Sequence, residues 1–272
     1  MQDWDAIIWF EWLVDSSEDR DNFVHSQFDL SHATVKTAQM PTASSLFRSQ
    51  LLSPADGRFT VHRPLESARL QTLLGKTALP WKMGDPNFLF RHQIRTSLND
   101  SPTPDTPGTE NQEVTWSEEE GRLTLNLSSL QAQVGKHPLE LPHLRGQLDS
   151  WAAISLMSTD GLPLGSSHSA LLTLATQQEN TGMAWDLAKT VIRAWGVAPI
   201  RIAPLRGQLE FQWPQRPHVY ALDQEGQVLR EIPVKRRRGG WWRIQLDGNE
   251  ATPWLQITSQ EHSESDSEPS PS

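Results

Sequence analysis

Tryptophan is the residue type in this chain that offers the most direct route to ligand chemistry. The 272 residues include 12 Trp but one Tyr. Indole rings stack on ligands when they are exposed and fill cores when they are buried. Trp241, Trp242 and Trp254 lie in stretches typical of strands, where adjacent side chains point to opposite faces. We therefore expect Trp241 or Trp242 outside the core, and these three are the first candidates for sugar stacking; the alternative is that they are core residues.

Acidic, histidine and basic residues offer weaker candidate sites. The stretch DSSEDRDN at 15–22 has the composition of a calcium loop but lacks the Gly and bidentate Glu spacing of an EF-hand, which favours a solvated loop. The nine His show no close metal-ligand spacing, and no phosphate loop, nucleophile elbow or zinc helix is present. We therefore predict neither a metal nor a cofactor. The stretch KRRRGG at 235–240 lies between strand patterns, which indicates a solvated hairpin tip rather than a nucleic-acid patch.

The composition limits the classes of protein. The net charge of −9 argues against a general nucleic-acid binder, which needs a basic footprint. A chain without Cys forms neither disulfides nor thiolate metal sites. No apolar run reaches the roughly 18 residues of a membrane span, and no signal segment is recognisable. These features predict no membrane or nucleic-acid partner, and they leave the compartment open, export of an intact parent included.

The first half of the chain mixes strand and helix patterns. WDAIIWFEW at 4–12 is typical of an apolar strand, and 33–50 is typical of a helix in which Pro41 marks a kink or a late start. Its expected inward stripe consists of Val35, Ala38, Ala43, Leu46 and Phe47. FTVHRPL and NFLFRHQIRTSL predict strands on either side of a helix at 65–75. Residues 53–98 are therefore expected to form a small α/β connector.

The second half has the pattern of an antiparallel β-sandwich. A Pro-rich linker at 99–112 precedes it, and short strands with turn residues between them fill 113–258. In RLTLNLSSL, Leu123, Leu125 and Leu127 alternate with polar residues. The end, 259–272, is an acidic segment that we expect to be disordered. The predicted fold class is mainly β, an antiparallel β-sandwich preceded by a small α/β segment.

Stretches in both halves of the chain resemble one family in their order and spacing. QDWDAIIWF followed by FDLSHATVKTAQMPTASSLFR is similar to the last βα unit of bacterial cellulase-like (β/α)8 glycoside hydrolases. SALLTLATQQENTGMAWD, WGVAPIRIAPLRGQLEF, HVYALDQEGQVLREIPV and the closing TPWLQI resemble the C-terminal β-domain of the same enzymes. The family-motif loop comprises Glu179, Asn180, Thr181, Gly182, Met183 and Trp185.

The resemblance implies that 1–52 is the remnant of a truncated barrel. A complete barrel takes roughly 250 residues, so seven βα units would be absent from this chain. Two explanations remain open. In the first, the gene was split or the chain starts at an internal Met; in the second, the chain is a true stand-alone remnant. A strand that has lost both neighbours leaves an unpaired apolar edge, which predicts poor solubility that improves when about fifty N-terminal residues are removed.

The resemblance also implies that both catalytic carboxylates lie upstream of this chain. Family members place the acid after the fourth strand and the nucleophile after the seventh, so no catalytic residue is assigned here. Trp9, Glu11 and Trp12 stand at the strand end that faces substrate in a barrel, and they are the candidate substrate-binding residues. In the motif loop, Asn180 and Gly182 are expected to form the turn and Trp185 to pack.

Two functions follow as expectations. The first is the C-terminal fragment of a polysaccharide-acting glycoside hydrolase that is inactive alone. Its partners would be a polysaccharide or oligosaccharide, reached through the parent enzyme, and the missing barrel portion as a separate chain. The second is a non-catalytic carbohydrate-binding or structural β-sandwich protein. The sugar, the linkage and the stereochemical outcome are set by groups outside this sequence.

Overall fold

The structure, a computed structural model, describes residues 34–52, 57–62, 92–97, 113–117, 119–135, 138–187, 191–248 and 252–259. The predicted strand at 4–12, the loop at 15–22, the helix at 65–75, the linker at 99–112 and the tail beyond 259 lie outside these residues. Within them the chain is mainly β with antiparallel sheets. This confirms the predicted fold class, and the barrel origin of the first residues stays a prediction.

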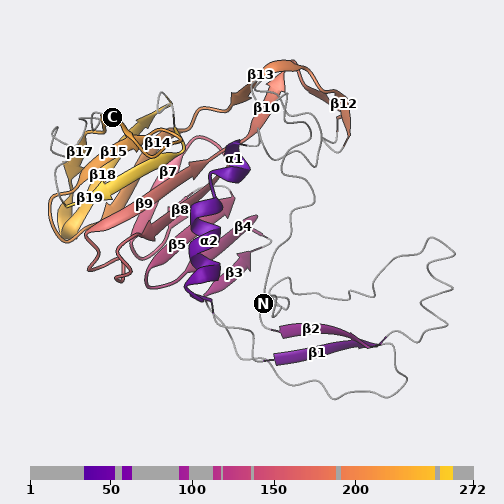
Figure 1. The fold of residues 1–272 in the computed structure, drawn as a ribbon, viewed down its shortest axis with the longest axis horizontal. Helices are drawn as coiled ribbons and strands as arrows, with labels where there is room; N and C mark the ends of the chain where they lie inside the picture. Colours follow the sequence, from indigo (N-terminus) through magenta and orange to yellow (C-terminus); the bar gives the residue numbers. More distant parts are fainter. Residues whose placement is uncertain are drawn as a thin grey trace, which may run out of the picture.

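Two antiparallel sheets make up the body of the protein (Figure 1). The larger sheet has the strand order β16-β15-β19-β9-β8-β5-β4-β3. Its strands are β3 (Val114–Ser117), β4 (Arg122–Asn126), β5 (Leu130–Gly135), β8 (Ala152–Ser158), β9 (Ser169–Ala175), β15 (His218–Leu222), β16 (Val228–Glu231) and β19 (Trp254–Thr258). The smaller sheet has the order β17-β18-β14-β7-β6. Its strands are β6 (Leu139–Glu140), β7 (Leu144–Leu148), β14 (Arg206–Gln212), β17 (Val234–Arg236) and β18 (Trp241–Asp247).

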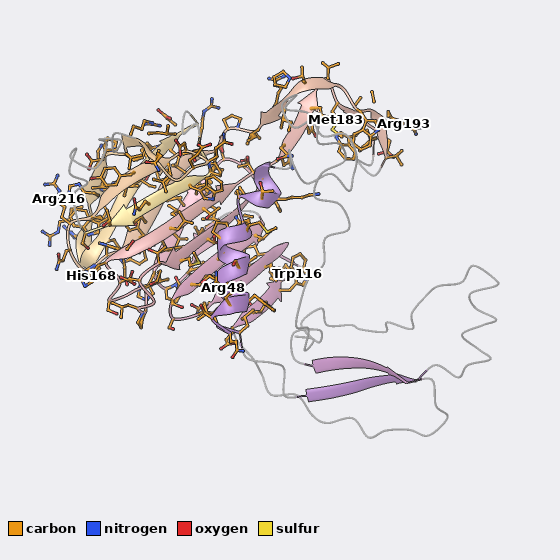
Figure 2. All side chains as sticks on the ribbon, in the orientation of Figure 1. Arg48, Trp116, His168, Met183, Arg193 and Arg216 are labelled. Atoms are coloured by element: carbon orange, nitrogen blue, oxygen red, sulfur yellow. The ribbon has the colours of Figure 1, made fainter. Side chains whose placement is uncertain are left out.

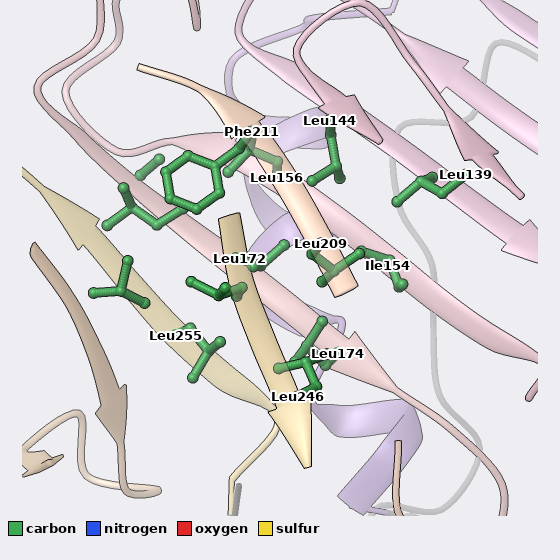
Figure 3. Packing of buried hydrophobic residues seen from close by; sticks show 14 of the residues in the cluster. Leu139, Leu144, Ile154, Leu156, Leu172, Leu174, Leu209, Phe211, Leu246 and Leu255 are labelled. Atoms are coloured by element: carbon green, nitrogen blue, oxygen red, sulfur yellow. The ribbon is translucent and has the colours of Figure 1, made fainter. Parts of the chain in front are cut away.

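The main core lies between the two sheets because each sheet turns alternate apolar residues inward. Leu209 and Phe211 of β14 face Leu156 of β8 and Leu172 of β9 within one buried cluster (Figure 3). All four are fully buried, and each such side chain contributes about 1.5–3 kcal/mol. The opposite alternation leaves a polar outer face on the smaller sheet, in the β14 sequence RGQLEFQ.

Two short helices, α1 (Thr34–Thr37) and α2 (Met40–Arg48), replace the single helix predicted at 33–50. Pro41 lies in the first turn of α2, where its missing N–H costs nothing, so the predicted late start is confirmed. The predicted stripe is wrong at Ala43 and Phe47, which are both exposed, while Thr42 is 6% exposed. The break at Ala38 and Gln39 changes the helical phase, and a stripe drawn on one continuous helix misses that change.

The remaining strands form small sheets. Strands β1 (Gly57–His62) and β2 (His92–Ser97) pair in parallel. Strand β10 (Gln178–Thr181) pairs with β13 (Val197–Ile202), and β11 (Ala184–Trp185) pairs with β12 (Ile192–Ala194). These last four strands form an arm, residues 178–202, that extends from the body beside α1 (Figure 1). In the described residues, no helix is long and apolar enough to cross a membrane.

Candidate functional site

The outer face of the larger sheet holds the α1–α2 segment, and we call the contact between residues 34–52 and this face the seam. The indole Nε1 of Trp254 donates to the carbonyl oxygen of Ala38 at 2.9 Å. The buried hydroxyls of Thr42 and Ser155 lie 2.9 Å apart, and Ser155 Oγ donates to Gln39 Oε1 at 3.3 Å. Buried polar groups pair specifically, so these bonds fix one position of the segment on the sheet.

A second apolar cluster completes the seam. Leu127, Leu130 and Met157 are buried on the outer face of the larger sheet. The C-terminal end of α2 and the turn after it cover them with the side chains of Leu46, Leu51 and Leu52. Figure 1 shows α2 crossing β5 and β8, the strands that carry Leu130 and Met157. The segment is therefore a third layer of the structure, separate from the core between the sheets.

The family-motif loop forms the tight end of the arm. Asn180 is 2% exposed, and its Nδ2 donates to the carbonyl oxygen of Trp195 at 3.0 Å. Gly182 has φ +73°, a conformation that glycine adopts without strain. Trp185 Nε1 donates to Glu179 Oε1 at 3.1 Å. In the described structure these side chains bond to one another and to the arm's own backbone, an arrangement that shapes a turn.

Two further motif residues lie on the same turn. Thr181 Oγ1 donates to the carbonyl oxygen of Pro199 at 2.8 Å, which ties β10 to β13. The Met183 N–H donates to the carbonyl oxygen of Asn180 at 3.0 Å. Figure 2 shows Met183 and Arg193 at the arm, away from the body of the protein. Met183 therefore lies on the arm and away from the sheets of the sandwich in this view.

The arm carries exposed apolar side chains close to the start of the described chain. Large apolar residues at its surface are Leu187, Val191, Val197 and Ile202, of which Val197 is 63% exposed. The backbone N–H of Val35 in α1 donates to Gln178 Oε1 in β10 at 2.8 Å. The chain therefore enters α1 directly beside the base of the arm.

The outer face of the smaller sheet holds a buried carboxylate among arginines. Glu210 is 8% exposed. Its Oε2 accepts from Arg145 Nη2 at 2.7 Å and its Oε1 accepts from Arg243 Nη2 at 2.6 Å. Arg237 Nε lies 3.6 Å from Oε1. Burial acts to raise the pKa of Glu210, but the hydrogen bonds and charges of Arg145 and Arg243 outweigh it and lower the pKa. Glu210 is therefore ionised at neutral pH.

A second carboxylate organises the loop between β8 and β9. Asp160 Oδ1 accepts from the Ser158 and Ser167 hydroxyls at 2.7 and 3.0 Å. Its Oδ2 accepts from the backbone N–H of His168 at 2.7 Å. Desolvation opposes ionisation here, yet these hydrogen bonds hold the pKa of Asp160 well below its usual range. The Asp160 carboxylate is bonded by groups of its own loop, so its role in the described structure is to hold that loop in shape.

The three candidate sugar-stacking tryptophans lie in three different surroundings. Trp254 is part of the seam. Trp242 packs against the core between the sheets. Trp241 lies on the outer face of the smaller sheet, with the Arg145 guanidinium carbon 3.9 Å from its ring centroid. The expected opposite orientation of Trp241 and Trp242 is present, but the three rings form no shared platform. Sugar stacking by them stays a prediction.

The candidate substrate-binding residues Trp9, Glu11 and Trp12 lie outside the described residues. Among the residues that the structure describes, no group of three or more His, Asp or Glu side chains could hold a metal ion. That the chain carries no metal or cofactor stays a prediction.

Sequence reasoning missed the cluster around Glu210, although part of its signal is local. The stretch QLEFQW alternates polar with apolar residues, which places Gln208, Glu210 and Gln212 on the solvent face. The burial of Glu210 depends on Arg145 and Arg243, which are cross-strand partners. Register across strands is a long-range property, so the sequence alone does not show that these groups meet.

Comparisons with known proteins identify no relative of this chain. No protein-family model matches it, no curated protein matches it, and no solved structure matches it.

Proposed function

We propose that this chain is the C-terminal part of a polysaccharide-acting glycoside hydrolase, in which the β-sandwich supports the end of a catalytic barrel. The seam carries this proposal, because a helical segment of the kind that ends a barrel is bonded to the sandwich by side chains from both partners. A sandwich that functioned alone would not need to fix this segment in one position.

The surface around the seam supports the same proposal. Ala43 and Phe47 lie on the part of α2 turned away from Thr42 and are exposed. The apolar arm begins beside α1, where residues 1–33 join the described chain. Exposed apolar groups mark an interaction site, and here they lie along α2 and on the arm beyond α1, at both ends of the α1–α2 segment (Figure 2). The occupant we assign to this region is the apolar stretch AIIWFEW at 6–12 together with the rest of the barrel.

The catalytic carboxylates of such a parent would lie upstream, as the family resemblance implies. Glycoside hydrolysis needs two carboxyl groups flanking the scissile bond. Two hydrogen-bonded carboxylates of the sandwich are unsuited to this work, because Asp160 closes its own loop and Glu210 is held by arginines. The chain alone is therefore inactive.

The test is to read the DNA upstream of the Met1 codon in all three forward frames and to join any encoded barrel to this chain. Reducing-sugar release from glucans, xylans and galactans is then measured for the chain and for the joined protein. We expect activity from the joined protein alone. Hydrolysis by this chain alone, or upstream DNA that encodes no βα units, would contradict the proposal.

The same experiment has a structural arm. In the joined protein, Thr42→Val and Trp254→Phe together remove the hydroxyl pair and the indole bond of the seam. We expect a lower thermal midpoint and lower activity, because the barrel end loses its fixed position. Arg216→Gln, an exposed change between β14 and β15 and away from both the seam and the arm (Figure 2), is the control and should leave both unchanged. Unaltered activity in the seam variant would show that the sandwich does not hold the end of the barrel in the position that catalysis needs.

A further inference from the structure

The outer face of the smaller sheet concentrates positive charge on an acidic protein. Register places Lys235 opposite Arg243, Arg243 opposite Glu210 and Glu210 opposite Arg145. Arg237 follows β17 and reaches the same carboxylate. We call Arg145, Glu210, Lys235, Arg237 and Arg243 the basic face. Three arginines contact the buried Glu210, Lys235 lies beyond Arg243, and the exposed Glu140 continues the row opposite Arg145. The row therefore keeps an excess of positive charge, while the whole chain carries a net charge of −9.

The cations of the basic face are held in place before any ligand arrives. Glu210 binds Arg145 through Nε and Nη2 and binds Arg243 through the same two nitrogens. The Arg145 guanidinium also stacks on Trp241. The Arg145 and Arg237 side chains nevertheless remain 47% and 41% exposed. A fixed guanidinium loses little conformational freedom on binding an anion, so these groups are ready to bind one.

Uncharged hydrogen-bonding groups continue the same surface. Gln147, Gln208 and Gln245 lie opposite one another on three adjacent strands and are exposed. Each amide offers two donor hydrogens and an acceptor oxygen. Gln245 Nε2 donates to the carbonyl oxygen of Gly207 at 2.9 Å. The surface therefore pairs guanidinium groups, which suit carboxylates, with a row of amides, which suit hydroxyls.

We propose that the basic face binds an anionic polysaccharide, with sugar carboxylates on the arginines and ring hydroxyls on the glutamine row. The proposal rests on the proposed function for the polysaccharide class, and it adds the charge of that polysaccharide. The three strand intervals from β17 to β7 span about 14 Å along the order β17-β18-β14-β7. The basic face therefore suits an extended chain that lies across the strands.

Two other anionic occupants fit the surface less well. Single-stranded nucleic acid binds through stacked bases, and one face of Trp241 is covered by Arg145. Ser259, the last described residue before the acidic segment 260–272, accepts a hydrogen bond from Trp213, whose backbone N–H donates to Gly240. The segment has carboxylates for the arginines and serine hydroxyls for the amides, but it has no extended row of ring hydroxyls. Both occupants are kept as outcomes of the test.

The test is affinity electrophoresis of the full chain in native gels that contain polygalacturonate, with hydroxyethylcellulose as the neutral polymer. We expect retardation by polygalacturonate that weakens with added salt, and none by the neutral polymer. Arg243→Gln and Lys235→Gln should each weaken retardation about fivefold to tenfold, as expected for one lost charged contact. Arg193→Gln, which changes the net charge equally but lies on the arm (Figure 2), should have no effect.

Lys235→Gln keeps the test interpretable if Arg243→Gln alters the fold, because Lys235 is exposed on an edge strand. Equal retardation by polyglutamate or by single-stranded DNA would overturn the proposal in favour of a general polyanion surface. Binding that appears only when residues 260–272 are removed would overturn it in favour of the acidic segment as occupant. Absence of binding by both the full chain and the chain without residues 260–272 would also overturn the proposal. That result would leave the hydrolase proposal untouched, because the hydrolase proposal is tested on the joined protein.

Discussion

Replacing Glu210 by Gln tests whether one buried carboxylate holds the basic face together. Gln keeps one acceptor oxygen and places an NH2 donor where the other oxygen was, so one arginine loses its acceptor and all three guanidinium groups face a neutral centre. Fully exposed ion pairs contribute about 0.2–1 kcal/mol, and breaking a fully buried pair costs about 3–5 kcal/mol. Glu210 is 10% exposed at its side chain while Arg145 and Arg243 are 47% and 28% exposed. We therefore expect E210Q to lower the free energy of unfolding by about 2 kcal/mol.

The dependence on pH has a definite sign. The pKa of Glu210 is lowered in the folded state, so its stabilisation is present above the unfolded-state pKa and is lost as the pH falls through the folded one. The difference between the native protein and E210Q should be constant from about pH 8 to pH 5 and shrink below about pH 4. Urea unfolding followed by tryptophan fluorescence at each pH gives the comparison.

The matched control is Glu140→Gln, the same chemical change on the edge strand β6. Glu140 lies opposite Arg145 in the register but is exposed, so we expect a loss below about 0.5 kcal/mol. The double variant of Glu210→Gln with Arg243→Gln should show a coupling energy of about 1 kcal/mol or more. If E210Q unfolds within about 0.5 kcal/mol of the native protein at pH 7, the carboxylate does not organise the arginines and the reasoning fails.

Three further predictions concern other parts of the fold. Asp160→Ala should lower the free energy of unfolding by about 1–2 kcal/mol at pH 7, with the difference disappearing in acid because the folded pKa is depressed; amide exchange at His168 locates the loss. Gly196→Ala should loosen the arm, since φ is +78° and the new Cβ would lie 2.3 Å from the Thr181 carbonyl oxygen; faster amide exchange in β10 with an unchanged core is the expected result. A chain that starts at Thr34 should be more soluble than one that starts at 53, because residues 34–52 cover Leu130 and Met157; equal yields in a sedimentation assay would contradict the seam.

The expectation that removal of about fifty residues improves solubility stays a prediction, but the seam bears on where the cut should fall. That expectation treated the helix at 33–50 as part of the lost barrel. In the structure, Leu46, Leu51 and Leu52 belong to an apolar cluster with the larger sheet. A cut near residue 50 would therefore remove the apolar stretch at 4–12 but expose the apolar cluster on the larger sheet. The apolar stretch at 4–12 is the part whose removal is expected to help.

Local patterns in the sequence predicted most of the sandwich. The alternation in RLTLNLSSL predicts β4 with the correct face, since Leu125 and Leu127 both join the cluster under α2. The hairpin tip before Trp241 is present between β17 and β18. Strand periodicity is a property of a few adjacent residues, and the sequence carries it directly. Pro41 also predicted the start of α2 for a local reason.

Contacts between distant residues could not be predicted in this way. The pairing of Thr42 with Ser155 spans 113 positions, and that of Trp254 with Ala38 spans 216. Nothing in either local stretch indicates the other. Trp254 is one of the three candidate sugar-stacking residues, and its contact with the α1–α2 segment could not be predicted from its own strand. The basic face was missed for the same reason, since Arg145 and Arg243 lie 98 positions apart in the printed sequence.

The two outer faces of the sandwich suggest a division of labour within the proposed hydrolase. The outer face of the larger sheet carries an apolar cluster around Leu130 and the buried hydroxyl of Ser155, and residues 34–52 cover both. The outer face of the smaller sheet keeps Glu210 buried among arginines, although apolar replacements of such groups are often neutral or stabilising. Stability alone therefore does not explain these charges, whereas a surface that must present fixed guanidinium groups to an anionic chain does. A sandwich that bound the barrel on one side and the polymer on the other would keep the polymer near the barrel. This tethering would raise the effective concentration of the polymer at the catalytic site.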